Sequence, residues 1–338
     1  MNNTMDPASL PPKPTVSDSG PRPLEKRPLP ARRTPGAAPG QPRPAVISLN
    51  WEEQDIENRW GLFKGGRFTS VNKTFSFILA ALASALFLWL MFMLDRSQLS
   101  FRRLGTIFVR PGNLFATGPA TLCFFWGVMV CLLKIPKLNL QRKALDLAAV
   151  PQDRDFVLNE ATARTVLERT RSLAGDTRQF ILLNRIDRAL SNLNNIGGIS
   201  DVAIILKAQA ENDENMVASS YAIIQAMIWS IPVLGFIGTV LGLSMAINRF
   251  TSVISVSQGA ISAAEEMNRM KEHLKDVTAG LSTAFETTLV GLGFALILHL
   301  IADLVQQRET DFLDDCNEYC QAHVVSKLRT RAKEDHAQ

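Results

Sequence analysis

Two long apolar runs in the second half of the chain most strongly limit what it can fold into. They cover residues 223–247 and 279–304, and a polar connector, 248–278, separates them. A helix rises ~1.5 Å per residue, so about 20 apolar residues cross the ~30 Å hydrocarbon core of a bilayer. Two earlier runs, 74–94 and 114–133, also meet this length requirement. The sequence therefore predicts an all-α polytopic membrane protein with four transmembrane helices.

The segments around these runs differ in composition. Residues 1–46 are rich in Pro and Arg and poor in large apolar residues, so we expect a disordered tail. Residues 47–70 place aromatic residues among charged ones, which predicts an amphipathic helix near the membrane. Residues 134–220 repeat apolar residues at helical spacing, which predicts a compact helical domain. We expect an amphipathic helix within the connector, and residues 305–338 to continue the fourth span as a helix.

Composition argues against several classes of protein. The chain is 46% hydrophobic and 20% charged, with a net charge of +4, so nothing indicates a nucleic-acid partner. Its basic segments beside the membrane are suited to anionic lipid. Four scattered cysteines predict no disulfide framework. The sequence contains no nucleotide-binding loop, nucleophile elbow or His-Glu-x-x-His motif, so we expect no enzyme activity, no cofactor and no bound metal.

Polar side chains inside the two long runs are the candidate functional residues. If the two spans are antiparallel, Thr239 on the first lies ~12 Å below the same membrane face as Thr287 and Thr288 on the second. The carboxylate of Glu286 is adjacent in sequence. Side-chain oxygens in hydrocarbon need partners, and an ionisable group there indicates function. The pattern therefore predicts a polar ring at one depth, and this ring is the candidate functional site.

Glu286 admits more than one interpretation. Inserting a charge at the centre of a span costs at least ~2.5–3 kcal/mol, so this side chain must face a pore, a partner or a cation, or else be protonated. On a helix it lies ~100° from Thr287 and ~200° from Thr288, so one subunit cannot direct all three into one narrow channel. A hydrogen bond between subunits and a relay of ions both remain open. Each threonine can also donate to a carbonyl of its own helix.

Small residues and a proline set the expected packing of these spans. Gly238 and Gly242 form a G-x-x-x-G step that Gly235 extends upstream, and Gly291 lies on the second span. Glycines let two helix backbones approach closely in lipid. Pro232 removes a backbone hydrogen bond, which predicts a kink shortly before the glycines.

Two short motifs carry a resemblance to a known family. Gly235 to Leu243 reads Gly-x-x-Gly-Thr-x-x-Gly-Leu, and Thr287 to Gly291 reads Thr-Thr-x-x-Gly. In this order on consecutive membrane helices, over about residues 218–320, they resemble the MotA/TolQ/ExbB ion-channel subunits of membrane motors. The resemblance implies a homopentamer around a dimer of a single-span partner of the MotB, ExbD or TolR kind. That partner has a periplasmic domain and an essential membrane Asp, and passing protons or sodium ions drive rotation.

The resemblance also assigns roles and a location. Thr239 and Thr288 match hydroxyls that line the ion path, and Thr287 matches a threonine typical of sodium-driven members. Glu286 departs from the best-known members and resembles a Phe-Asp-Thr-Thr variant, which leaves the choice of ion open. H⁺ is the expected ion, with Na⁺ as the alternative. The resemblance implies the bacterial inner membrane, with both termini and the helical domain in the cytoplasm and the third and fourth helices extending into it.

A second function class stays open on the sequence alone. A non-conducting membrane scaffold would tether partners through the Pro-rich tail and the helical domain, with the threonines as packing groups. A secondary transporter is a weaker alternative, because no inverted repeat is visible across the four spans.

Overall fold

The computed structural model describes residues 49, 51, 57, 66, 68–97, 102–147, 149–153, 156–191, 199–256 and 263–329. Within these residues the fold is helical, and the only β-type pairing is two isolated bridges, Leu49 with Ala174 and Leu158 with Leu328. The helices are α3 (Lys73–Arg96), α4 (Arg102–Val109), α5 (Pro111–Asp146), α6 (Glu160–Leu173), α7 (Ile181–Ser191), α8 (Ile199–Ser220), α9 (Ala222–Val256) and α10 (Ala263–Cys320). A 3₁₀ turn, Thr177–Gln179, precedes α7, and a π-helical turn, Gln321–Val325, follows α10.

Four helical segments in the described part of the chain are long and apolar enough to cross a membrane. They are Lys73–Arg96, Pro111–Asp146, Asp201–Thr251 and Met270–Val325. The third combines α8 and α9, which meet at a single turn residue, Tyr221. The prediction of an all-α protein with four membrane-spanning helices is therefore confirmed.

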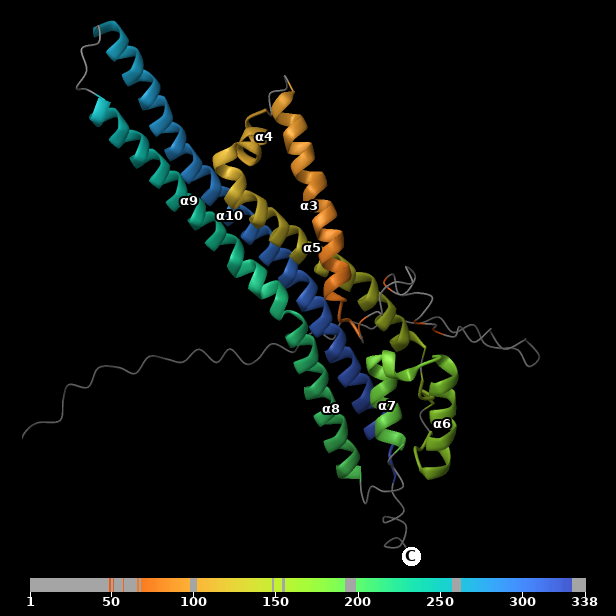
Figure 1. The fold of residues 1–338 in the computed structure, drawn as a ribbon. Coiled ribbons are helices and arrows are strands. Elements are labelled where there is room, and N and C mark those ends of the chain that lie inside the picture. Colours follow the sequence, from red (N-terminus) through yellow and green to blue (C-terminus); the bar gives the residue numbers. More distant parts are fainter. Residues whose placement is uncertain are drawn as a thin grey trace, which may run out of the picture. The chain divides into compact units, whose positions relative to one another are not determined.

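Helices α9 and α10 lie side by side and antiparallel, and α5 packs along both of them (Figure 1). Small residues of α5 allow this, since Ala116 and Ala120 are buried at the contact. Because α5 packs against α9, α10 and α3, much of this span lies inside the bundle. By contrast α3 contacts mainly α4 and α5, and it leaves large apolar side chains such as Leu82 and Leu86 exposed.

The long helices do not stop where hydropathy changes. Helix α9 continues past residue 247 to Val256, and α10 runs unbroken from Ala263 to Cys320. Helix α10 therefore joins about half of the expected connector, the fourth span and about half of segment 305–338 in one element. Its sequence contains no proline, and a change from apolar to charged residues alters what a helix faces without ending it.

The polar segment between the second and third spans forms a helical domain. Helices α6, α7 and α8 pack with the ends of α5 and α10 (Figure 1). Its core contains Phe180, Leu182, Ile186 and Phe312, each fully buried. This core fixes the inner ends of the helices that carry the candidate site.

Described residues of segment 47–70 contact this domain and α5. Trp51 is buried and packs edge-on against Phe180, with ring centroids 5.4 Å apart. Buried Glu57 pairs with Lys137 of α5 at 2.7 Å. The proline-rich tail, residues 1–46, and the aromatic Trp60 and Phe63 lie outside the described residues.

A buried polar network, the junction network of Thr69, Lys134, Ser220, Tyr221 and Glu309, connects the membrane helices to the helical domain. Lys134 Nζ lies 2.9 Å from Glu309 Oε2, and both side chains are 1% exposed. Tyr221 Oη donates to the same oxygen at 2.8 Å, and Thr69 Oγ1 donates to Glu309 Oε1. Lys134 also donates to Ser220 Oγ at 2.8 Å. One carboxylate therefore holds α5, α10, the α8–α9 turn and the segment before α3 together.

Candidate functional site

Glycines on α9 and α10 bring the two helix backbones into direct contact. A Cβ added at Gly242 would lie 2.7 Å from the backbone nitrogen of Ala284 and 2.7 Å from the carbonyl oxygen of Gly280. Gly235 and Gly291 face each other in the same way, since a Cβ added at Gly291 would lie 3.1 Å from the Gly235 Cα. Side chains that project from this contact are consequently held close to one another.

Thr239 of α9 and Thr288 of α10 meet across the glycine contact. Their Oγ1 atoms are 2.5 Å apart, and either hydroxyl can donate. Thr239 Oγ1 also lies 3.2 Å from the carbonyl oxygen of Gly235, and Thr288 Oγ1 lies 3.2 Å from that of Ala284. Both threonines are only partly buried. The result is a small oxygen cluster on two adjacent helices that remains reachable from the surface of the chain.

Thr287 does not join that pair. Its side chain is 1% exposed and donates to the carbonyl oxygens of Thr283 and Ala284, 3.0 and 3.1 Å away, in its own helix. It packs against Gly238 of α9, where an added Cβ would lie 2.5 Å from the Thr287 Oγ1. The expected ring of three hydroxyls is thus a pair in one chain, because consecutive helical residues point ~100° apart.

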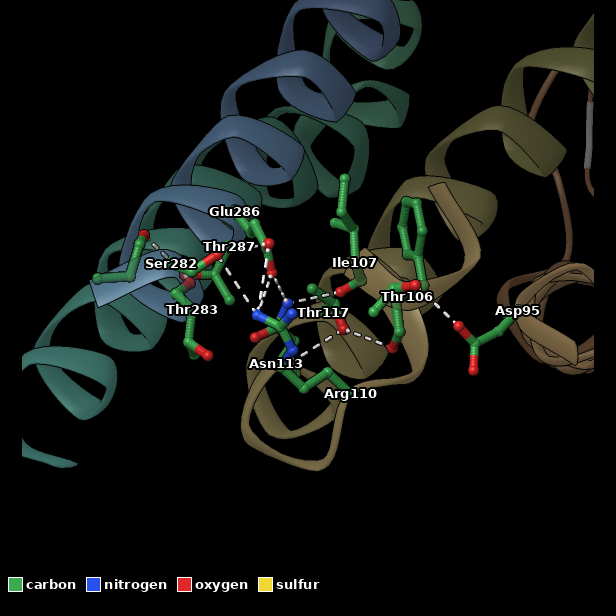
Figure 2. A network of polar contacts seen from close by, with 12 residues as sticks. Asp95, Thr106, Ile107, Arg110, Asn113, Thr117, Ser282, Thr283, Glu286 and Thr287 are labelled. Atoms are coloured by element: carbon green, nitrogen blue, oxygen red, sulfur yellow. Dashed lines mark hydrogen bonds and ion pairs between the residues drawn. The ribbon is translucent and has the colours of Figure 1, made fainter. Parts of the chain in front are cut away.

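Glu286 has partners within the same chain (Figure 2). Asn113 Nδ2 donates to its Oε2 at 2.7 Å, and Arg110 Nη1 lies 3.2 Å from the same oxygen. Ser282 Oγ donates to Oε1 at 2.8 Å. Of the two sequence-based alternatives, contact between subunits or relay of ions, neither included this intramolecular ion pair.

Sequence reasoning missed Arg110 and Asn113 as site residues. The available signal was position, because Arg110 directly precedes the start of α5 at Pro111, next to the second apolar run. It is an arginine at a span end, and Glu286 lies in the first half of the antiparallel fourth span. Which arginine reaches it depends on how α5 packs against α10, and that is a tertiary property.

Pro232 lies inside α9, and the helix continues through it. The missing backbone N–H leaves one carbonyl of the preceding turn without its helical partner. The proline falls one residue after the fully buried Ile231 and just before Gly235. The glycine contact includes this turn, since a Cβ added at Gly291 would lie 3.2 Å from the carbonyl oxygen of Ile231.

The described part of the chain contains no group of three or more His, Cys, Asp or Glu side chains placed to hold a metal ion. The site instead consists of neutral hydroxyls, backbone carbonyls and one paired carboxylate. Such oxygens accept protons or bind weakly held cations.

Comparison with known proteins finds one matching family. No curated protein and no solved structure matches the chain. Residues 181–318 match the model of the MotA/TolQ/ExbB proton channel family. The matched region runs from the start of α7 almost to the end of α10, and it contains both helices of the hydroxyl pair. Proteins of this family act in ion transport and not as enzymes. The chain is therefore a multi-pass membrane protein in which residues 181–318 are similar to the MotA/TolQ/ExbB proton channel family.

Proposed function

We propose that the protein is the ion-conducting subunit of a membrane motor driven by the ion-motive force. Five copies would surround a dimer of a single-span partner that carries a membrane Asp and an outer domain of the MotB, ExbD or TolR kind. The assembly would lie in a bacterial inner membrane, with both termini and the helical domain in the cytoplasm. The observation that carries this proposal is the contact between the Thr239 and Thr288 hydroxyls.

The chemistry of that pair suits ion transfer. Two hydroxyls and the Gly235 carbonyl oxygen lie within hydrogen-bond distance of one another, so a proton or a partly dehydrated cation would find several oxygens at one place. The pair is partly exposed, and a carboxylate of another chain can approach it. Each elementary charge that crosses is worth ~2.3 kcal/mol per 100 mV of membrane potential. Alternating protonation of the partner would then favour one contact after another around the ring.

H⁺ is the transported ion in this proposal, with Na⁺ as the alternative, and the chain needs no resident cofactor. Thr287 follows the pattern of sodium-driven members, although its hydroxyl bonds within its own helix. We assign Thr287 and Glu286 to the surroundings of the path and Thr239 and Thr288 to the path itself. Pro232, Gly235, Gly238, Gly242 and Gly291 would serve it by holding α9 against α10.

The test replaces both path hydroxyls, in the double variant Thr239→Val with Thr288→Val. Valine keeps the volume and removes the oxygens, so a passing charge loses hydrogen bonds worth ~1.5–3 kcal/mol, and ion flux should fall about ten- to a hundredfold. Flux is measured as internal pH change, and separately as Na⁺ uptake, in cells that express the complete motor.

Thr251→Val with Thr278→Val is the matched control. It also removes one hydroxyl from each helix, but both of these are exposed and donate to carbonyls of their own turns. The control should keep normal flux. Unchanged flux in the path variant, with normal assembly, would contradict the proposal and favour a non-conducting scaffold.

A further inference from the structure

The contacts around Glu286 leave one buried atom unexplained. Asn113 is fully buried, and its Nδ2 donates to Glu286 Oε2 and to the Ile107 carbonyl oxygen, each 2.7 Å away. Its Oδ1 is also buried and has no hydrogen-bond partner among the described residues. A buried acceptor of this kind costs free energy unless a donor or a cation satisfies it. The residue therefore points to a ligand at the cluster of Arg110, Asn113, Ser282 and Glu286.

The arginine in this cluster holds the carboxylate loosely. Each hydrogen bond found for the Arg110 guanidinium uses one nitrogen, Nη1, which is shared among Glu286 Oε1, Oε2 and Ser282 Oγ at 3.2–3.4 Å. The two-pronged contact that makes arginine–carboxylate pairs strong is not formed here. The Arg110 side chain is 33% exposed and that of Glu286 is 21% exposed. An ion pair of this exposure can be replaced by another cation.

We propose that Glu286, Asn113 and Ser282 form a binding site for a monovalent inorganic cation, with Arg110 as a tethered competitor. Their carboxylate, amide and hydroxyl oxygens are hard ligands of the kind that such cations prefer. One carboxylate balances one positive charge, so the site suits a monovalent ion better than a divalent one. This inference rests on the proposed function and deepens it, since it gives the transported ion a place to lose part of its water.

The cluster lies at the start of α5, and the helical domain packs against the other end of that helix (Figures 1 and 2). Cations would therefore reach it from the side of the membrane opposite the helical domain. It lies on the α4–α5 side of α10, whereas Thr288 faces α9. Glu286 and Thr288 are two positions apart on α10, so they point ~200° away from each other. The cation site and the hydroxyl pair can therefore be tested independently.

The experiment measures binding without transport. The full-length protein, purified in its native oligomer, is titrated with NaCl, KCl or LiCl against choline chloride at constant ionic strength and pH, and its thermal unfolding is followed. Wild type should gain thermal stability in one alkali-metal salt over choline. Arg110→Gln removes the competitor and should lower the half-saturating cation concentration about two- to fivefold. Arg102→Gln, at an exposed position at the start of α4, is the matched control and should behave as wild type.

The carboxylate variants complete the test. Glu286→Gln should lose the cation response. The double variant Arg110→Gln with Glu286→Gln should also lose it. Because the double variant removes both charges together, it keeps the test valid if the single variant folds poorly. The Thr239→Val with Thr288→Val protein should keep the response, so failure of the path proposal and failure of this one are distinguishable. An unchanged response in Arg110→Gln, or a response that survives in the double charge variant, would overturn the cation site.

A second arm identifies the ion. The titrations are repeated in choline at several pH values, because a proton can also neutralise the Glu286 carboxylate. Glu286, Arg110 and Asp95 are among the charged groups at this corner, and Asp95 accepts a hydrogen bond from Thr106 at 2.8 Å. Stabilisation of Arg110→Gln by acid, with no response to any alkali-metal ion, would reflect protonation of the carboxylate and would refute the cation site. Stabilisation by an alkali-metal ion alone assigns it to that ion, and the absence of both refutes the proposal.

Discussion

Gly242→Ala is expected to destabilise the protein by ~1–3 kcal/mol, the usual cost of overpacking a close contact. The added methyl would lie 2.7 Å from two backbone atoms of α10, the Ala284 nitrogen and the Gly280 oxygen. Backbone cannot rotate away as a side chain can, so α9 and α10 must separate. Their separation would also pull apart the Thr239 and Thr288 hydroxyls. The measurement is the midpoint of unfolding of the purified protein in detergent, together with ion flux in cells.

Gly293→Ala provides the matched control for this prediction. It makes the same chemical change on the partner helix, but no atom lies within 4 Å of the added Cβ. Alanine is also the better helix former, by roughly 0.5–1 kcal/mol. The control should therefore be as stable as wild type or slightly more so. Equal stability of the two variants would show that the glycine contact does not hold α9 against α10.

Glu309→Gln is expected to cost ~3–5 kcal/mol, because it leaves the buried ammonium of Lys134 without a counter-charge. The pair is 1% exposed on both sides, so water cannot take over the role of the lost partner. The same change weakens the acceptor for the Tyr221 and Thr69 hydroxyls. These two hydrogen bonds tie the α8–α9 turn and the segment before α3 to α10. The helical domain should then loosen from the membrane helices. Thermal unfolding and protease sensitivity of the purified protein measure this effect.

A double-mutant cycle separates lost pairing from lost packing. Lys134→Met alone should also destabilise, whereas Lys134→Met with Glu309→Gln removes both charges and should recover most of the loss. Asp276→Asn is the control, since it makes the same carboxylate-to-amide change in an exposed pair with Arg249, 3.0 Å away. Exposed pairs contribute at most about 1 kcal/mol. A loss in Glu309→Gln no larger than that in Asp276→Asn would contradict a structural role for the junction network.

Hydropathy and spacing predicted the parts of the fold that depend on local sequence. A run of about 20 apolar residues determines a span by itself, so the four crossings and the helical character of residues 134–220 could be read from the chain. Helix ends were harder to predict. Nothing in the sequence between Ala263 and Cys320 breaks a helix, and the expected boundaries marked only changes of surroundings.

The candidate site was predictable to the extent that it depends on two antiparallel helices. The sequence predicted that Thr239 and Thr288 lie at the same depth, and its glycines predicted a close approach of the two helices. The surroundings of Glu286 depend on a third helix. Its contacts with Arg110 and Asn113 join residues about 170 positions apart in the chain, and helical periodicity carries no information about such a distance.

The sequence by itself determined that this chain crosses a membrane four times and carries oxygen atoms inside two of those crossings. Both follow from the composition of short segments, because lipid requires each span to satisfy its own backbone. Only the tertiary structure decided that Glu286 is paired with Arg110, that Thr287 turns away from the hydroxyl pair, and that Glu309 holds Lys134 at the junction. These outcomes depend on how separate helices pack, and close packing is fixed by the whole set of facing side chains rather than by any one segment.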